Sequence, residues 1–220
     1  EDPGTARYGE SLYTFFPRTL FGSYKSAWGI EKHRLTAIKG HKHPWVPQNR
    51  MIWFTLNNFI FPAIVYKMFG LKALIFFLII AFYTVFYLEA INYIEHYGLV
   101  RKQIGPNEYE RVDIRHSWNA PHRFTNYLLF KLQRHSDHHE NAYKPYQILL
   151  TLEESPMLPH GYSLSIIMAF FPDTWFSVMH KMLDAHREKR ELKEHEKAFV
   201  TRQSVKLILW LSAITLGGTA

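Results

Sequence analysis

The chain has 220 residues, a formal net charge of +7 and 13 histidines, but it has no cysteine. The length predicts one domain, at most two, and the lack of thiols excludes disulfides, cysteine nucleophiles and cysteine-bound zinc or iron–sulfur centres. Any metal must therefore be bound by nitrogen or oxygen atoms. A basic balance of this kind suits nucleic acid, an anionic membrane surface or an acidic protein partner.

The first 50 residues are polar, with scattered aromatic residues and prolines. We expect short helices and loops here, in the cytosol. Within them, the stretch SLYTFFPRTLFGSYKSAW places aromatic residues at near-helical spacing. This spacing fits a helix that lies along a membrane surface and an ordinary amphipathic core helix equally well.

Residues 51–94 are strongly apolar and form two stretches around Gly70, each with a long uncharged run. Each stretch, with its flanks, reaches the roughly 20 residues of a membrane-spanning helix. Gly70 predicts a tight turn, so we expect a transmembrane hairpin, with a buried hairpin of a soluble protein as the alternative. The eight Lys and Arg of residues 1–50 predict that both ends of the hairpin face the cytoplasm.

Residues 95–180 form a polar block that holds most of the histidines, and residues 181–220 form a charged helix and an apolar tail. Within the block, GYSLSIIMAFFPDTWF is apolar but broken by Pro172, so we expect it at the membrane interface or packed beneath the bundle. The fold class is therefore expected to be all-α. It would be an integral-membrane helical bundle built on residues 51–94, with residues 95–180 as a cytoplasmic, histidine-rich helical cap.

Three histidines fall within five positions of the stretch KLQRHSDHHENAYKPY, namely His135, His138 and His139. On a helix these positions share one face, and three imidazoles on one face can bind one metal ion or serve two neighbouring ions. Neutral imidazole suits iron, zinc, copper or nickel. Asp137 is close enough in sequence to orient a ring through a hydrogen bond. The alternative is a basic, pH-sensitive surface cluster.

A second signal lies at the end of the second apolar stretch, in EAINYIEHYGL. Glu89, Asn92 and His96 recur near one face of a helix. Ionisable groups at the end of a membrane helix are costly and usually functional. We therefore expect His96 to be a metal ligand, with Glu89, Asn92 or Glu95 orienting its ring. Taken alone, His96 would more often be a structural residue.

The stretch RHSWNAPHRFTN adds His116 and His122, whose spacing fits no single helical face. We expect a structured loop in which Trp118 and Asn119 pack or hydrogen-bond near the site, and in which either histidine could bind metal. Four further histidines are expected to be bystanders on turns or charged helices: His160, His180, His186 and His195.

Four motifs, in the order NYIEHYGL, HSWN, LQRHSDHH and SPMLPHGY, resemble those of the integral-membrane alkane monooxygenases, within the wider superfamily of membrane-bound fatty acid desaturases and hydroxylases. The resemblance covers residues 1 to about 180. It implies a non-haem centre of two iron ions, activation of O₂, and insertion of one oxygen at the terminal methyl of a medium- or long-chain alkane. By motif, the iron ligands would be His96, His135, His138 and His139.

The same resemblance implies rubredoxin as the electron donor, separate or fused, and a bacterial inner membrane with the active site facing the cytoplasm. Rubredoxins are acidic, so the net charge of +7 would favour their docking. Membrane lipid and the alkane complete the expected partners. We expect no nucleic-acid partner, because the basic residues are dispersed and no nucleic-acid-binding module is visible.

The resemblance also has departures. The family carries two further histidine motifs that are absent here, and four histidines cannot satisfy two irons, so we expect one membrane hydroxylase domain that is incomplete within residues 1–220. One alternative function is that of a related fatty acyl or xylene-type hydroxylase or desaturase. Another is a non-enzymatic membrane protein that binds metal through its histidine cluster, which would leave NYIEHYGL unexplained.

Overall fold

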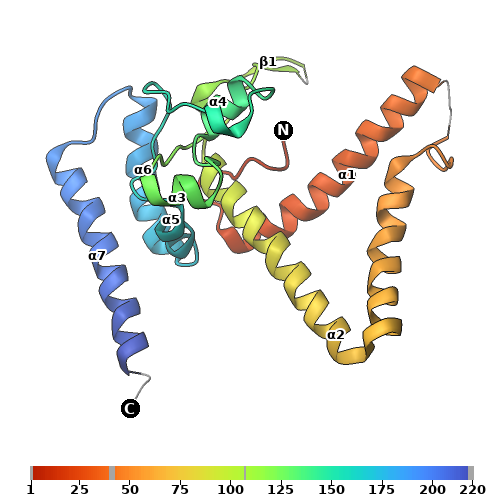
Figure 1. Ribbon diagram of the computed structural model, residues 1–220. Helices are drawn as coiled ribbons and strands as arrows, with labels where there is room; N and C mark the ends of the chain where they lie inside the picture. Colours follow the sequence, from red (N-terminus) through yellow and green to blue (C-terminus); the bar gives the residue numbers. More distant parts are fainter. Residues whose placement is uncertain (1, 40–42, 107, 218–220) are drawn as a thin grey trace. The chain divides into compact units, whose positions relative to one another are not determined.

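The computed structural model describes residues 2–39, 43–106 and 108–217 and is mostly helical (Figure 1). This confirms the expected predominance of helix. The chain divides into two compact units. The first comprises residues 1–4 and 16–89, and the second comprises residues 5–15 and 90–220.

The first unit consists of most of α1 (Leu12–Lys39) and most of α2 (Arg50–His96). We expected short helices and loops before residue 50, but α1 is one long helix that continues through Pro17. The carboxylate of Glu31, which is only 3% exposed, forms ion pairs with Arg34 at 2.6 Å and with Arg50 at 2.9 Å. It also accepts the main-chain N–H of Arg50 at 2.9 Å. This buried carboxylate fixes the start of α2 against α1.

Helix α2 is long and apolar enough to cross a membrane, and it is the one such helix among the described residues. Its apolar side chains are largely exposed, with only 11% of its most apolar window buried. A helix that is apolar on every side is stable only inside a protein core or in lipid. Gly70 interrupts the helix with φ 82° and ψ −177°, a conformation that is essentially restricted to glycine. The turn expected at Gly70 is therefore present, as a sharp bend within α2 (Figure 1).

The second unit contains the remaining elements. A short two-stranded antiparallel sheet is formed by β1 (Gln103–Gly105) and β2 (Glu108–Tyr109). The short elements that follow are η1 (Ile114–His116), α3 (Arg123–Leu128), α4 (His135–Glu140) and η2 (Tyr146–Ile148). The last three helices are α5 (Tyr162–Ala169), α6 (Pro172–Arg187) and α7 (Glu194–Gly217).

An aromatic core holds the last turn of α2 within this unit. The ring of Trp175, from α6, lies 5.6 Å from that of Tyr93 and 5.4 Å from that of Tyr97. The indole N–H of Trp118 donates to the carbonyl of Tyr97 at 2.9 Å. Pro172 is the first residue of α6, where a missing N–H costs little. The apolar stretch around Pro172 is therefore packed in a core, because it supplies the buried faces of α5 and α6.

The charged segment expected as one helix is divided. Helix α6 ends at Arg187 and α7 begins at Glu194, with Lys189 at φ 50° between them. Helix α7 buries Val200, Ser204 and Leu207 and exposes much of its remaining apolar surface. Residues 218–220 of the apolar tail lie outside the described residues.

Candidate metal centre

Three histidine side chains converge in the second unit. His96 comes from the last residue of α2, and His135 and His139 come from α4. One potential ligand atom from each lies within 4.8 Å of the other two. The ring centroid of His96 lies 5.2 Å from that of His135 and 5.1 Å from that of His139. Residues i and i+4 of a helix point to the same side, which explains why α4 presents His135 and His139 together.

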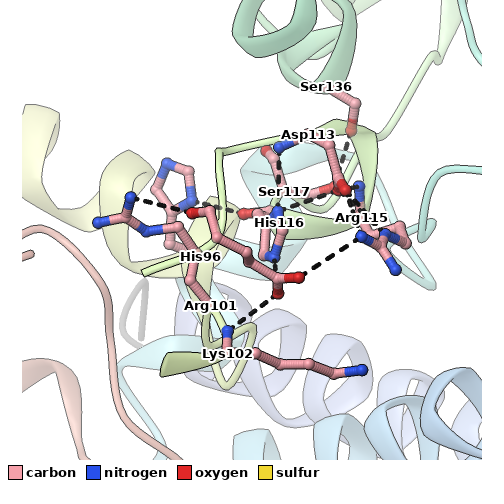
Figure 2. Close-up of polar contacts among 9 residues, drawn as sticks. His96, Arg101, Lys102, Asp113, Arg115, His116, Ser117 and Ser136 are labelled. Carbon is pink, nitrogen blue, oxygen red and sulfur yellow. Dashed lines mark hydrogen bonds and ion pairs between the residues drawn. The ribbon is translucent and has the colours of Figure 1, made fainter. Parts of the chain in front are cut away.

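The tautomer of His96 follows from its hydrogen bond. Its Nδ1 lies 2.9 Å from the main-chain carbonyl of His116 (Figure 2). A carbonyl oxygen can only accept, so Nδ1 of His96 carries the proton and donates it. The Nε2 atom then keeps its lone pair and lies 3.4 Å from Nε2 of His139. This is the arrangement of a metal-binding imidazole whose other nitrogen is held by the protein.

His135 lies in a buried polar environment. Its Nε2 is 3.4 Å from Oε2 of Glu95, and the hydroxyl of Tyr162 donates to Oε1 of the same carboxyl group at 2.6 Å. Burial, followed by the nearby His96 and His139, holds the pKa of His135 well below its ordinary value. Its ring is therefore neutral, as a metal ligand must be.

The donor set fits a metal ion with nitrogen ligands. The Nδ1 of His135 is buried and has no hydrogen-bond partner among the described residues, which is unusual for a buried polar atom. Three imidazoles beside the carboxyl group of Glu95 match the preferences of iron or zinc. Of the expected ligands, the structure thus brings His96, His135 and His139 together. His138 is exposed, and its ring lies beside theirs, 5.7 Å from that of His135 and 6.1 Å from that of His139.

Four residues were expected to orient the ligands, and only one of them makes a described contact with a converging histidine. Glu95 contacts His135 directly. Asn92 and Glu89 are half-buried on α2, one and two turns before His96. Asp137 accepts hydrogen bonds at 2.8 Å from Asn141, Lys144 and the N–H of Leu150. These contacts fix the loop that follows α4.

The HSWN segment holds α4 in place. The side chain of Asn119 accepts the N–H of Ser136 at 3.0 Å and donates to the hydroxyl of Ser136 at 2.9 Å. It also donates to the hydroxyl of Ser155. Trp118 is buried in the aromatic core described above. Both residues therefore lie in a segment that contacts the helices carrying the three histidines.

The remaining candidates lie outside the three-histidine cluster. Both ring nitrogens of His116 contact protein groups, Glu110 and Asp113. His122 is exposed and lines a small cavity of about 310 Å³ with His160.

Two of the expected bystanders are packed within the unit. His180 contacts the hydroxyl of Tyr97 at 3.0 Å, and His186 is half-buried with its ring 6.0 Å from that of Trp118. Sequence reasoning also missed Tyr162 as a site residue. It lies in SPMLPHGY, a quoted motif, but no spacing rule connects a tyrosine there with a glutamate on α2.

A charged cavity of about 1160 Å³ adjoins the His116 segment. Its wall includes Glu110, Arg115 and His116, which precede the HSWN tryptophan in the chain, and His186 and Arg187 from α6. The three converging histidines are not part of this wall.

Comparison with known proteins identifies the family. The sequence profile of the fatty acid desaturase family matches residues 1–167. The chain belongs to the fatty acid desaturase family. All the histidines that converge in the structure lie within the part of the chain that matches this family.

The chain is also similar to curated alkane and xylene/toluene monooxygenases. It is 41% identical to alkane 1-monooxygenase 2 of Alcanivorax borkumensis, over 86% of this chain and 49% of that protein. It is also 41% identical to alkane 1-monooxygenase of Acinetobacter baylyi, over 84% of this chain and 45% of that protein. The xylene/toluene monooxygenase hydroxylase component of Pseudomonas putida is 26% identical, over 82% of this chain and 47% of that protein. The chain thus spans about half the length of the curated relatives that it matches.

Proposed function

We propose that this chain is part of a membrane-bound, non-haem iron monooxygenase that hydroxylates the terminal methyl of medium- or long-chain alkanes. The observation that carries the proposal is the convergence of His96, His135 and His139 at the end of a helix long and apolar enough to span a membrane. Membership of the fatty acid desaturase family and about 40% identity to two alkane 1-monooxygenases support the reaction class.

We propose that His96, His135, His138 and His139 bind iron. Bound iron supplies the activation of O₂ that attack on an unactivated C–H bond requires, which no side chain provides. In this chain His96 offers Nε2 because Nδ1 is held by His116, and Glu95 orients His135. Two irons need more ligands than four histidines supply. We therefore infer that a complete centre with two irons takes further ligands from residues that are absent from this chain.

The membrane arrangement that we propose follows from the break in α2. Residues 50–69 and residues 71–96 would each cross the bilayer, with Gly70 at the tip of the hairpin. The eight Lys and Arg of residues 1–50 favour the cytoplasm for both ends of the hairpin. The second unit, with its histidines, would then be a cytoplasmic cap on a bacterial inner membrane. Both units would belong to one membrane hydroxylase domain.

Two properties of the chain support the proposed substrate and electron donor: the exposed apolar surface of α2 and the positive net charge. Exposed aromatic and aliphatic side chains of α2, such as Phe59, Phe76 and Phe82, would contact lipid or an alkane. We propose rubredoxin as the electron donor, since an acidic protein would be attracted by the net charge of +7.

The test combines metal content with oxygen labelling. A longer protein that contains this chain together with the further ligands is supplied, in membranes, with octane, ¹⁸O₂, rubredoxin and a reductant, and the alcohol is analysed by mass spectrometry. We expect 1-octanol that carries ¹⁸O, and iron in the detergent-solubilised protein. His139→Ala should remove both, whereas His195→Ala, at an exposed position of α7, should change neither.

Two results would contradict the proposal. One is bound zinc with no iron and no labelled alcohol, which would favour a metal-binding protein without oxidase activity. The other is full iron content and turnover in His139→Ala, which would show that the convergent histidines are not the reaction centre.

A further inference from the structure

His116 is bound by the protein at both ring nitrogens. Its Nδ1 accepts the main-chain N–H of Asp113 at 3.0 Å, and its Nε2 donates to the carboxylate of Glu110 at 3.1 Å (Figure 2). The residue is only 7% exposed. Oδ1 of Asp113 also lies 3.0 Å from Nδ1. Because protein groups contact both ring nitrogens, this ring has no free lone pair to offer a metal.

The main chain of the same residue reaches the histidine cluster. The carbonyl oxygen of His116 accepts the Nδ1–H of His96 at 2.9 Å. This contact decides which nitrogen of His96 is protonated, and thereby directs Nε2 toward His139 at 3.4 Å. An acceptor on the far nitrogen of a metal-binding histidine fixes both its tautomer and its ring orientation.

The turn that carries this carbonyl is rigid because its hydrogen bonds are reciprocal. The Asp113 carboxylate accepts the N–H of Arg115 at 2.8 Å, while the His116 ring accepts the N–H of Asp113. The second of these bonds, together with a bond from the N–H of His116 to the Asp113 side chain, forms a capping box around η1, in which the third residue, usually Glu or Gln, bonds back to the cap residue. Here a histidine fills that position.

Further contacts anchor the turn on both sides. Glu110, which accepts from the His116 ring, also accepts the N–H of Lys102 at 2.9 Å, and this bond is the main cause that lowers the pKa of Glu110. The carbonyl of Ser117 accepts the hydroxyl of Ser136 at 2.9 Å, which ties the segment to α4. The N–H of Trp118 donates to the carbonyl of Glu95 at 2.8 Å, which ties it to α2. Residues 116–118 therefore join the two helices that supply the converging histidines.

We propose that His116 is a positioning residue for the metal centre: its ring, held by Glu110, fixes the turn whose carbonyl orients His96. The importance of this role for catalysis rests on the proposed function. The hydrogen bonds themselves are present in this chain whether or not that function is correct. It assigns His116 a purpose other than metal ligation.

The capping box supplies a sharp set of variants. His116→Gln retains one acceptor and one donor and is the usual residue at this position of a capping box. His116→Leu retains bulk but loses both hydrogen bonds. Glu110→Ala removes the acceptor of the ring at a position where the glutamate side chain is 23% exposed. It tests the same contact from the partner side, and it also removes the acceptor of the Lys102 N–H.

Two readouts are measured on the detergent-solubilised chain. The first is ¹⁵N NMR of labelled histidine at pH 8 without metal, which reports the tautomer of His96, assigned by its loss in His96→Gln. The second is the dissociation constant of Co²⁺, measured by competition with a coloured chelator. We expect His116→Gln to keep the Nδ1–H form of His96 and the Co²⁺ affinity. We expect His116→Leu to mix the tautomers and to weaken Co²⁺ binding about 10- to 100-fold, with Glu110→Ala changing both in the same direction.

Each outcome decides the proposal. If His116→Leu and Glu110→Ala keep the tautomer and affinity of the unchanged chain, the positioning role is wrong. If His116→Gln loses Co²⁺ affinity as severely as His116→Leu while the tautomer of His96 is unchanged in both, His116 is a ligand and the proposal is also wrong. If the chain binds no Co²⁺ but the tautomer of His96 changes as expected, the positioning role is supported and the proposed function fails separately.

Discussion

Asn119 should be the residue outside the converging histidines on which α4 most depends. Its side chain is buried at 1% exposure and makes three hydrogen bonds, two to Ser136 and one to Ser155. In Asn119→Ala both serine hydroxyls keep another acceptor, since Ser136 donates to the carbonyl of Ser117 and Ser155 to that of Leu152. The buried N–H of Ser136 loses its side-chain acceptor.

The magnitude follows from these losses. A buried polar group left without a partner costs about 1–3 kcal/mol, and each of the other two hydrogen bonds contributes about 0.5–1.5 kcal/mol. Asn119→Ala should therefore lower the free energy of unfolding by about 2–6 kcal/mol. Ser155→Ala removes only one of the three bonds to Asn119, and it should cost about 1 kcal/mol.

The assay is denaturant unfolding of the detergent-solubilised chain, followed by near-UV circular dichroism, with Co²⁺ affinity measured in parallel. Because Ser136 is the second residue of α4, Asn119→Ala should weaken Co²⁺ binding more than Ser155→Ala does. If the two variants were equally stable, or if Asn119→Ala lay within about 0.5 kcal/mol of the unchanged chain, the assignment of Asn119 as the anchor of α4 would be refuted.

Three further predictions concern backbone and pH. Gly98→Ala should lower the free energy of unfolding by about 2–4 kcal/mol, because Gly98 has φ +70° and a Cβ there would lie 2.5 Å from Cδ1 of the buried Leu183. Adding Leu183→Ala to this variant should restore part of the loss. If the losses of the two single variants simply added in the double variant, the proposed clash would be contradicted. Gly70→Ala should cost about 1–3 kcal/mol through strain alone, since a Cβ at Gly70 meets no described atom within 4 Å; a neutral result in the same assay would mean that the bend relaxes. Burial lowers the pKa of His160, His180 and His186, so the unfolded chain, with histidine pKa near 6.5, binds more protons and stability should fall as pH drops below about 6.5. Unfolding at pH 7.5 and 5.5 checks this, and equal stability at both values would contradict it.

The sequence predicted the parts of the site that depend on local geometry. The spacing of His135 and His139 fixes their common direction on any helix, and the glycine between two apolar stretches marked the bend at Gly70. The convergence of His96 with α4 depends on contacts between segments far apart in the chain, such as the bond from His96 to His116. The position of His96 at the end of the apolar stretch, together with the motif resemblance, indicated that it belonged with the cluster, but neither showed how close it lies to α4.

Other features were misjudged because composition reports an average over a segment. His180 and His186 were expected to be bystanders on a charged helix, yet one face of α6 is buried at Trp175, Val178 and Leu183. His180 and His186 therefore pack within the unit. Similarly, prolines before residue 50 suggested short helices, although α1 tolerates Pro17 within it. A proline removes one main-chain hydrogen bond, and the tertiary contacts of a long helix can outweigh that loss.

Helix α4 has only six residues, and this length has a consequence for how the site exists in solution. An isolated helix shorter than about 12 residues is marginal in water, so α4 owes its form to the loops that surround it. Local opening of this segment would separate His135 and His139 from His96 without unfolding the rest of the chain. A metal ion that binds only the ordered form of α4 would therefore increase the population of that form, and contacts that order α4 would increase the affinity for the metal.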